Sequence, residues 1–393
     1  MKDFVFYSPT KVIFGENAQQ NVGECIREFF GTKVLLHFGG KSAEKSGLLN
    51  EVETLLKKAE IEYVKLGGVV ANPRLSKVNE GIKLCKAENV DFILAVGGGS
   101  VIDSAKAIAY GVKYNGNVWD FYSRTAQAKD ALPVGAILTV AAAGSEMSDA
   151  SVITNDDGLL KRGYSSLFGH CKFALMNPKL TFTLSPYQTA SGCVDILMHT
   201  FERYFSVQGE TILQDEIAQG LVKSVIINAK IAVKDPENYN ARSEIMWAST
   251  LSHNGTTGDR FLGDWACHQL EHELSALYGV AHGAGLAAVW PTWAKYVMNT
   301  DFKRFAKLGR CVFGIDEPND ELAATMCVEK FKEFFKQINM PVCVADMGIS
   351  KADYNPQLLA EKCSFFGKRT IGAFKKLDQS DMCNIYENAY LGV

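Results

Sequence analysis

The stretch VDFILAVGGGSVIDSAKAIAYGV, residues 90–112, decides the fold class, because it joins a strand pattern to a helix pattern through three glycines. Residues 92–96 are continuously apolar, as strands covered on both faces are. Residues 101–112 then carry apolar and small side chains at helical spacing. A buried strand that runs directly into a helix is typical of an α/β domain with a parallel sheet.

The same alternation occupies the rest of the first half of the chain. Strand patterns and the helix patterns that follow them lie at 33–38, 45–59, 61–66 and 74–89. After about residue 185, β-rich runs become rare and long helical patterns follow one another. The sequence therefore predicts an α/β Rossmann-like dinucleotide-binding domain over residues 1–185 and an all-α metal- and substrate-binding domain over residues 186–393.

Composition narrows the class of partner. The 393 residues include 41 basic and 44 acidic side chains, for a net charge of −3, which favours neither nucleic acid nor an anionic membrane as a partner. No apolar run reaches the roughly 18 residues of a membrane span, and the first residues lack a signal-peptide core. The 10 cysteines form no C-x-x-C pair, which is typical of reduced thiols in the cytoplasm.

The glycine turn Gly97, Gly98, Gly99 and Ser100 is a candidate phosphate-binding site. Glycine lacks the Cβ that would hold a phosphate away from the backbone, and a helix start presents unpaired N–H groups. The turn does not match the spaced G-x-G-x-x-G fingerprint and has no P-loop lysine. The alternative is that the glycines serve only a tight turn.

A second glycine pair, Gly39 and Gly40, follows the strand pattern 33–38. Many dinucleotide sites place an acidic residue at this point, where it holds the ribose 2′-hydroxyl. Here the next residues are Lys41 and Ser42, which tolerate a 2′-phosphate. We therefore expect NADP(H) to be favoured over NAD(H), against the alternative that the lysine is only solvated.

Histidines and one aspartate gather in two windows of the helical half. The candidate metal ligands are Asp195, His199, His268, His272 and His282. The first two are four apart, as are the next two, so each pair shares a helix face; the last follows Gly279, where we expect a helix to end. One carboxylate and three imidazoles suit Fe²⁺ or Zn²⁺, which leaves one imidazole free as a proton relay.

Two other interpretations of these residues stay open at this point. The run HQLEH, residues 268–272, fits the H-x-x-E-H pattern of a zinc hydrolase, in which His268 and His272 bind zinc and Glu271 is the base. The aspartate–histidine pair and the nucleotide-type first half weigh against it. In the second interpretation the protein is a nucleotide-binding scaffold with structural histidines and no metal.

Read together, these residues resemble the iron-containing (group III) alcohol dehydrogenase family, in its butanol dehydrogenase-like, broad-range aldehyde reductase branch. The motifs that carry the resemblance are GGGSVIDSAKA (97–107), LTVAAAGSEMS (138–148), GCVDILMHTFE (192–202) and HQLEHELSALYGVAHGAGLAAVWPTW (268–293). The resemblance implies Asp195, His199, His268 and His282 as ligands. It leaves His272 as the unbound imidazole on the substrate side.

The same resemblance implies an activity and further contacts. Reversible hydride transfer would run between NAD(P)H and short-chain primary alcohols or aldehydes, with a polyol (glycerol-type) dehydrogenase as the alternative. Cofactor contacts are implied for Asp103, Thr139 and Lys161, with an exposed lysine as the other interpretation of the last. One departure is Ala143, where the family usually has threonine. The resemblance also implies a homodimer.

Overall fold

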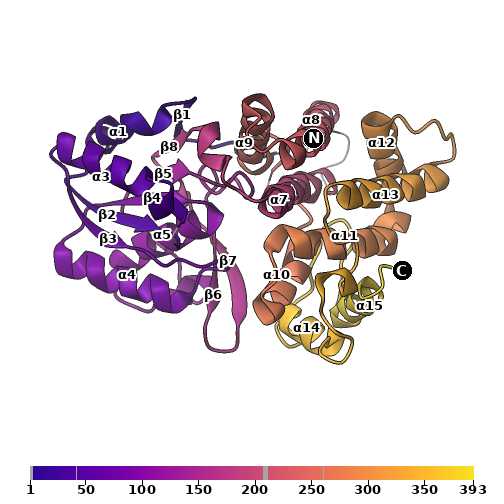
Figure 1. The fold of residues 1–393 in the computed structure, drawn as a ribbon. Helices are drawn as coiled ribbons and strands as arrows, with labels where there is room; N and C mark the ends of the chain where they lie inside the picture. Colours follow the sequence, from indigo (N-terminus) through magenta and orange to yellow (C-terminus); the bar gives the residue numbers. More distant parts are fainter. Residues whose placement is uncertain (1–2, 41, 207–210, 260) are drawn as a thin grey trace. The chain divides into compact units, whose positions relative to one another are not determined.

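The structure is a computed structural model that describes residues 3–40, 42–206, 211–259 and 261–393 (Figure 1). The chain divides into two compact units. One unit is Tyr7–Thr183, and the other is Leu184–Val393 together with the first residues of the chain up to Phe6.

A parallel six-stranded sheet forms the centre of the first unit, in the order β1-β8-β5-β4-β2-β3 (Figure 1). The strands are β1 (Lys11–Phe14), β2 (Lys33–Phe38), β3 (Glu62–Leu66), β4 (Phe92–Gly97), β5 (Val134–Leu138), β6 (Ala150–Asn155), β7 (Leu160–Ser165) and β8 (Phe173–Met176). Two of these strands, β6 and β7, lie outside the six-stranded sheet and form a separate antiparallel hairpin, which was not predicted from the sequence.

Helices cover both faces of this sheet. They are α1 (Val22–Glu28), α2 (Ser42–Lys45), α3 (Leu48–Lys58), α4 (Leu75–Glu88), α5 (Gly99–Val112) and α6 (Trp119–Tyr122). On one face Leu36 and Leu94 pack with Val52 of α3 in a buried core. On the other face His37 of β2 bonds Ser104 of α5 at 2.9 Å. The predicted Rossmann-like α/β half is therefore confirmed.

The second unit is helical, as predicted. Its helices are α7 (Pro186–Tyr204), α8 (Ile212–Lys234), α9 (Tyr239–His253), α10 (Ala266–Tyr278), α11 (His282–Val297), α12 (Phe302–Phe313), α13 (Asp320–Gln337), α14 (Pro356–Cys363) and α15 (Gln379–Ala389). Pro186 suits the first position of α7 because proline has no N–H to leave unpaired there. Ser185 and Gln188 form a capping box that satisfies other N–H groups at this helix start. Gly279 ends α10 in the left-handed conformation (φ 67°), as expected for a glycine after a helix.

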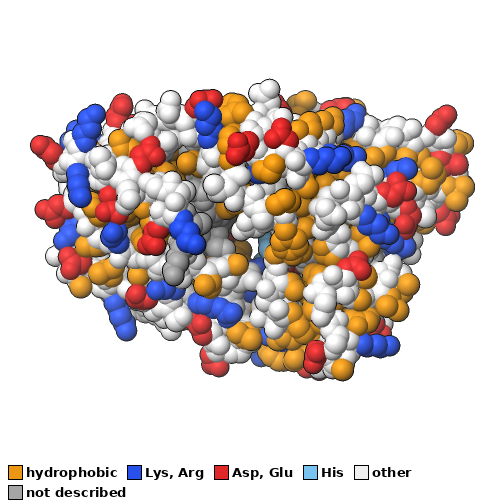
Figure 2. All heavy atoms as spheres, in the orientation of Figure 1, with side chains coloured by type: hydrophobic (Ala, Val, Ile, Leu, Met, Phe, Trp, Pro, Cys, Tyr) orange, Lys and Arg blue, Asp and Glu red, His pale blue; other side chains and the backbone are white. Residues whose placement is uncertain are grey.

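Acidic and basic side chains are interspersed on the face drawn in Figure 2, as expected from the small net charge. Within the described residues, no helix combines the length and the apolar composition needed to cross a bilayer.

A buried lysine orders the loop that follows β5. Lys106 of α5 is fully buried, and its Nζ donates to the carbonyl oxygens of Ser145 (2.6 Å), Ser148 (2.8 Å) and Ala150 (2.9 Å). A buried ammonium is tolerable only when its donors are paired, so the lysine and the loop conformation require one another. This contact holds residues 145–150 against the middle of α5.

We predict that Lys106→Met lowers the free energy of unfolding by roughly 3 kcal/mol, because buried carbonyls that lose a donor cost about 1–3 kcal/mol each. Urea unfolding of the full chain measures the change. The control is Lys83→Met on the exposed side of α4, which should stay within about 0.5 kcal/mol. Equal shifts in the two variants would show that the three carbonyls find other donors.

Candidate functional site

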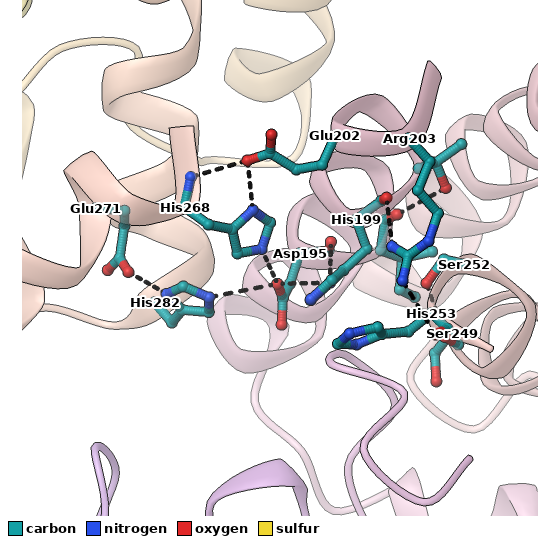
Figure 3. A network of polar contacts seen from close by, with 12 residues as sticks. Asp195, His199, Glu202, Arg203, Ser249, Ser252, His253, His268, Glu271 and His282 are labelled. Atoms are coloured by element: carbon teal, nitrogen blue, oxygen red, sulfur yellow. Dashed lines mark hydrogen bonds and ion pairs between the residues drawn. The ribbon is translucent and has the colours of Figure 1, made fainter. Parts of the chain in front are cut away.

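Three helices of the second unit bring the predicted metal ligands together (Figure 3). Asp195 and His199 lie one turn apart on α7. His268 lies in the first turns of α10, and His282 is the first residue of α11. The side chains of the first three are buried, whereas that of His282 is about a quarter exposed.

One carboxylate oxygen, Asp195 Oδ1, is the common neighbour of the imidazoles. It lies 3.6 Å from His268 Nε2, 3.6 Å from His282 Nε2 and 3.1 Å from His199 Nδ1. Neither Asp195 Oδ1 nor His268 Nε2 has a hydrogen-bond partner of acceptable geometry among the described residues. Buried polar atoms are almost always satisfied, so these two atoms point to a missing partner.

The spacing of these atoms fits a metal ion. Ligand atoms about 2.1 Å from a tetrahedral ion lie about 3.4 Å from one another. The two distances of 3.6 Å from Asp195 Oδ1 are close to that edge length. Asp195, His268 and His282 therefore form a set whose ligand atoms suit a divalent cation, and these atoms all lie within 4.8 Å of one another.

His199 lies beside this set rather than within it. Its Nδ1–H donates to the backbone oxygen of Asp195 at 2.9 Å. The ring centroid is 4.4 Å from that of His268 and 4.1 Å from that of His253, on which it stacks. The fourth predicted ligand is therefore adjacent to the other three. The stacked His253, which ends α9, was not predicted, because nothing in its local sequence distinguishes it.

Two buried carboxylates hold the Nδ1 sides of the other imidazoles. Glu202 Oε1 accepts from the Nδ1–H of His268 (2.7 Å) and from its backbone N–H (2.9 Å). Glu271 Oε2 accepts from the Nδ1–H of His282. Glu202 was not predicted from the sequence, although its spacing of three residues from His199 places both on one face of α7. Glu271 was considered only as the base of a hydrolase.

Burial and neighbouring charge shift the pKa values of these groups in different directions. Burial raises the pKa of Asp195, but His199 and His282 outweigh this effect and hold the pKa well below its usual range. Burial lowers the pKa of His199 to about 4. Burial also opposes protonation of His268, but the carboxylates of Asp195 and Glu202 raise its pKa to about 9. The lowered pKa of Asp195 thus favours the ionised form of its carboxylate.

His272 is half-buried and belongs to a different group of possible ligand atoms than His268 does. Its ring centroid lies 5.8 Å from that of His282. Ligand atoms of Glu271, His272 and His282 also lie within 4.8 Å of one another, but no such group among the described residues joins His272 to His268. The H-x-x-E-H interpretation needs those two histidines on one zinc ion, so the geometry weighs against it.

Glycine allows α11 to approach α7 closely enough to bring His282 to Asp195. A Cβ on Gly283 would lie 1.9 Å from the backbone oxygen of Ser191 on α7. A real Cβ cannot approach a backbone oxygen so closely, so any other residue at this position forces the helices apart. The histidine that precedes this glycine would move with α11.

The predicted phosphate-binding segments are neighbours in the first unit. Phe38 of β2 pairs with Val96 of β4, so Gly39 and Gly97 leave the same edge of the sheet side by side. The strand order also changes direction between these two strands, which is where open α/β sheets bind ligands. Gly40 is exposed, whereas Lys41 and the side chain of Ser42 lie outside the described residues.

Packing explains part of the glycine turn. A Cβ on Gly98 would lie 2.8 Å from Val140, and a Cβ on Gly99 would lie 3.1 Å from Ala143. The turn therefore has to lack side chains for close packing against the loop after β5, at the point where α5 begins at Gly99, next to Ser100.

The remaining predicted contacts lie around this turn. The Thr139 N–H donates to Gly97 O at 3.0 Å. Asp103 accepts from the Val152 N–H at 2.9 Å, and burial raises its pKa to about 6. Lys161 is buried on β7, at 4% exposure, so the interpretation of an exposed lysine is wrong. Cofactor contacts of these residues stay predictions.

Comparison with known proteins identifies the family. Residues 9–178 match the family described as iron-containing alcohol dehydrogenase, and residues 189–390 match the Fe-containing alcohol dehydrogenase family, C-terminal. The chain belongs to the iron-containing alcohol dehydrogenase family, which confirms the resemblance drawn from its motifs.

Similar proteins match over nearly the whole chain. The "Probable NADH-dependent butanol dehydrogenase 1" of Bacillus subtilis is 40% identical, over 98% of this chain and 99% of its own. The NADPH-dependent aldehyde reductase YqhD of Escherichia coli is 32% identical, over 99% and 96%. The crystal structure of the NADH-dependent butanol dehydrogenase A of Thermotoga maritima superimposes with a TM-score of 0.95 at 37% identity, over 99% of each chain.

We predict that Gly283→Ala destabilises the protein by about 1–3 kcal/mol or more, as overpacking does, and lowers its Zn²⁺ content because His282 moves away from Asp195. Urea unfolding and metal analysis measure the two effects. Gly220→Ala on α8 is the matched control: its Cβ meets nothing within 4 Å, so alanine should add about 0.5–1 kcal/mol of stability. A Gly283 variant with unchanged stability and full Zn²⁺ content would contradict the close-contact argument.

Proposed function

We propose that this protein is a metal-dependent alcohol dehydrogenase and aldehyde reductase that interconverts short-chain primary alcohols and aldehydes with NAD(P)H. The observation that carries the proposal is the pair of unsatisfied buried atoms, Asp195 Oδ1 and His268 Nε2, 3.6 Å apart in a chain of this family. The proposed ligands of Fe²⁺ or Zn²⁺ are Asp195, His199, His268 and His282.

When bound, a divalent cation supplies Lewis acidity toward the substrate oxygen, and the nicotinamide supplies or accepts the hydride. The chain's own residues then have three tasks. The carboxylate and the imidazoles hold the cation, and the turn Gly97 to Ser100 with the start of α5 binds the pyrophosphate. His272 is the proposed proton acceptor during alcohol oxidation, because its imidazole is half-buried beside His282, with 5.8 Å between the ring centroids, and imidazole is the most frequent general base in enzymes.

Three finer assignments are proposals as well. A preference for NADP(H) is supported by the lysines that follow β2 and by the name of YqhD, whereas the butanol dehydrogenases are named for NADH. A cytoplasmic location is supported by the ten cysteines, all of which lie in the described part of the chain and none of which forms a disulfide there. Self-association as a homodimer is supported by the exposed apolar side chains of Phe4, Val5 and Phe6.

We predict that protein stripped of metal by a chelator loses butanol-dependent reduction of NADP⁺ and regains it with Fe²⁺ or Zn²⁺, because the substrate oxygen needs the Lewis acid. Absorbance at the NADPH band measures the rate, and elemental analysis measures the metal. Full activity of the stripped protein would overturn the proposal.

Two histidine variants serve as controls for the metal experiment. His268→Ala should abolish both metal binding and activity. His272→Ala should keep the metal and lower kcat by about 10²- to 10⁴-fold, the usual contribution of a general acid–base group. Loss of metal from His272→Ala, with retention in His268→Ala, would favour the Glu271, His272 and His282 group instead.

We also predict a higher kcat/KM for NADPH than for NADH with butanal as substrate. The Lys41→Glu variant should lower kcat/KM for NADPH more than for NADH, since an acid repels the 2′-phosphate and suits the 2′-hydroxyl. A wild-type protein that favours NADH would show that the charge of the segment after β2 does not decide the cofactor.

A further inference from the structure

The imidazoles around Asp195 differ in the groups that hold their Nδ1 atoms. Those of His268 and His282 face buried carboxylates, Glu202 and Glu271. The Nδ1 of His199 instead faces Asp195 itself, 2.9 Å from its backbone oxygen and 3.1 Å from its Oδ1. Figure 3 shows both acids beside their histidines, and at 3% exposure for Glu202 and 0% for Glu271 neither is placed for contact with solvent.

We propose that Glu202 and Glu271 are positioning residues that hold His268 and His282 with Nε2 toward the cation and raise the affinity of the centre for it. This inference rests on the proposed metal centre. An ionised carboxylate only accepts hydrogen bonds, so each Nδ1 must carry a proton, and an imidazole that gives up its other proton to bind a cation then offers the lone pair of Nε2. Both Nε2 atoms then face Asp195 Oδ1 at 3.6 Å.

Charge adds to this geometric effect. A carboxylate bonded to Nδ1–H makes the opposite nitrogen a stronger donor to a metal, and loss of such a partner typically weakens metal binding about 10- to 100-fold. Asp195, Glu202 and Glu271 together bring three formal negative charges to one buried cluster. A divalent cation compensates two of them, which is a reason to bury acids at this place.

The packing around Glu271 indicates a position prepared for that carboxylate. A Cβ on Gly285 of α11 would lie 2.8 Å from Glu271 Oε1 and 2.9 Å from its Cγ. The bare backbone of α11 thus leaves room for the acid that bonds the first residue of the same helix. Gly285→Ala displaces the carboxylate without removing a polar group.

The test measures the Kd for Zn²⁺ by competition with a chromophoric chelator, in the purified full chain. Glu202→Gln and Glu271→Gln keep an acceptor oxygen but remove the charge, and we expect each to raise the Kd about 10-fold. The alanine variants remove both and should approach about 100-fold. Gly285→Ala should raise the Kd in the same direction as Glu271→Gln.

A second readout separates positioning from mere structural support. Co²⁺ bound in place of Zn²⁺ should show shifted visible absorption bands in the Glu202 and Glu271 variants, because the imidazole ligands change in strength. Asp215→Asn on α8 is the matched control. Asp215 is a buried carboxylate of the same unit that bonds Arg304 and Lys307, so its loss should lower stability and leave the Kd within twofold.

The outcomes are distinct. A wild-type protein that binds one equivalent of Zn²⁺, with both glutamine variants within twofold of its Kd, would overturn the inference and leave the metal centre intact. An equal rise of the Kd in Asp215→Asn would also overturn it, since general destabilisation would then explain the effect. A wild-type protein that binds neither Zn²⁺ nor Co²⁺ would overturn the proposed metal centre itself.

Discussion

The buried carboxylate of Asp195 is the constraint on which the helical unit depends. Burial of an ionised acid costs several kcal/mol unless charge and hydrogen bonds compensate it. The groups that face Asp195 Oδ1 are imidazoles from three helices, and one protonated imidazole cannot balance a cluster that also contains Glu202 and Glu271. The arrangement becomes electrostatically reasonable with a divalent cation among these atoms, and this accounts for the convergence of α7, α10 and α11.

The helices reach this point because of contacts made by the chain just outside the ligands. The Asp264 N–H donates to Glu202 O at 2.7 Å, so the start of α10 is tied to α7. The Asp264 carboxylate accepts from the N–H groups of Ala373 and Phe374, both at 2.7 Å, and so ties the same point to the C-terminal segment. With Gly283 against α7, both ends of the 266–282 stretch are fixed. The positions of His268 and His282 follow from these anchors.

Sequence patterns predicted the elements more completely than the contacts between them. Parallel strands and long helices show in periodicity, and Gly279 signalled the end of α10. The hairpin β6–β7 was missed even though the Asp-Gly pair at 157–158 is a turn signal between β-prone runs. Periodicity reports which residues share a face of one helix, as Asp195 and His199 do. It contains nothing about residues that meet across helices, so the contacts of Glu271 and His253 required the structure.

The run HQLEH shows how tertiary contacts choose between two chemistries that one local pattern permits. A general base in a hydrolase has to face a water at the substrate. Glu271 is instead fully buried, bonded to His282 and packed under Gly285. The residues that bury Glu271 are His282 and Gly285, which lie eleven or more positions later in the sequence, in the next helix. The same glutamate that would activate a water in one fold therefore bonds a neighbouring imidazole here, and the half-buried His272 is left as the proton-transfer candidate.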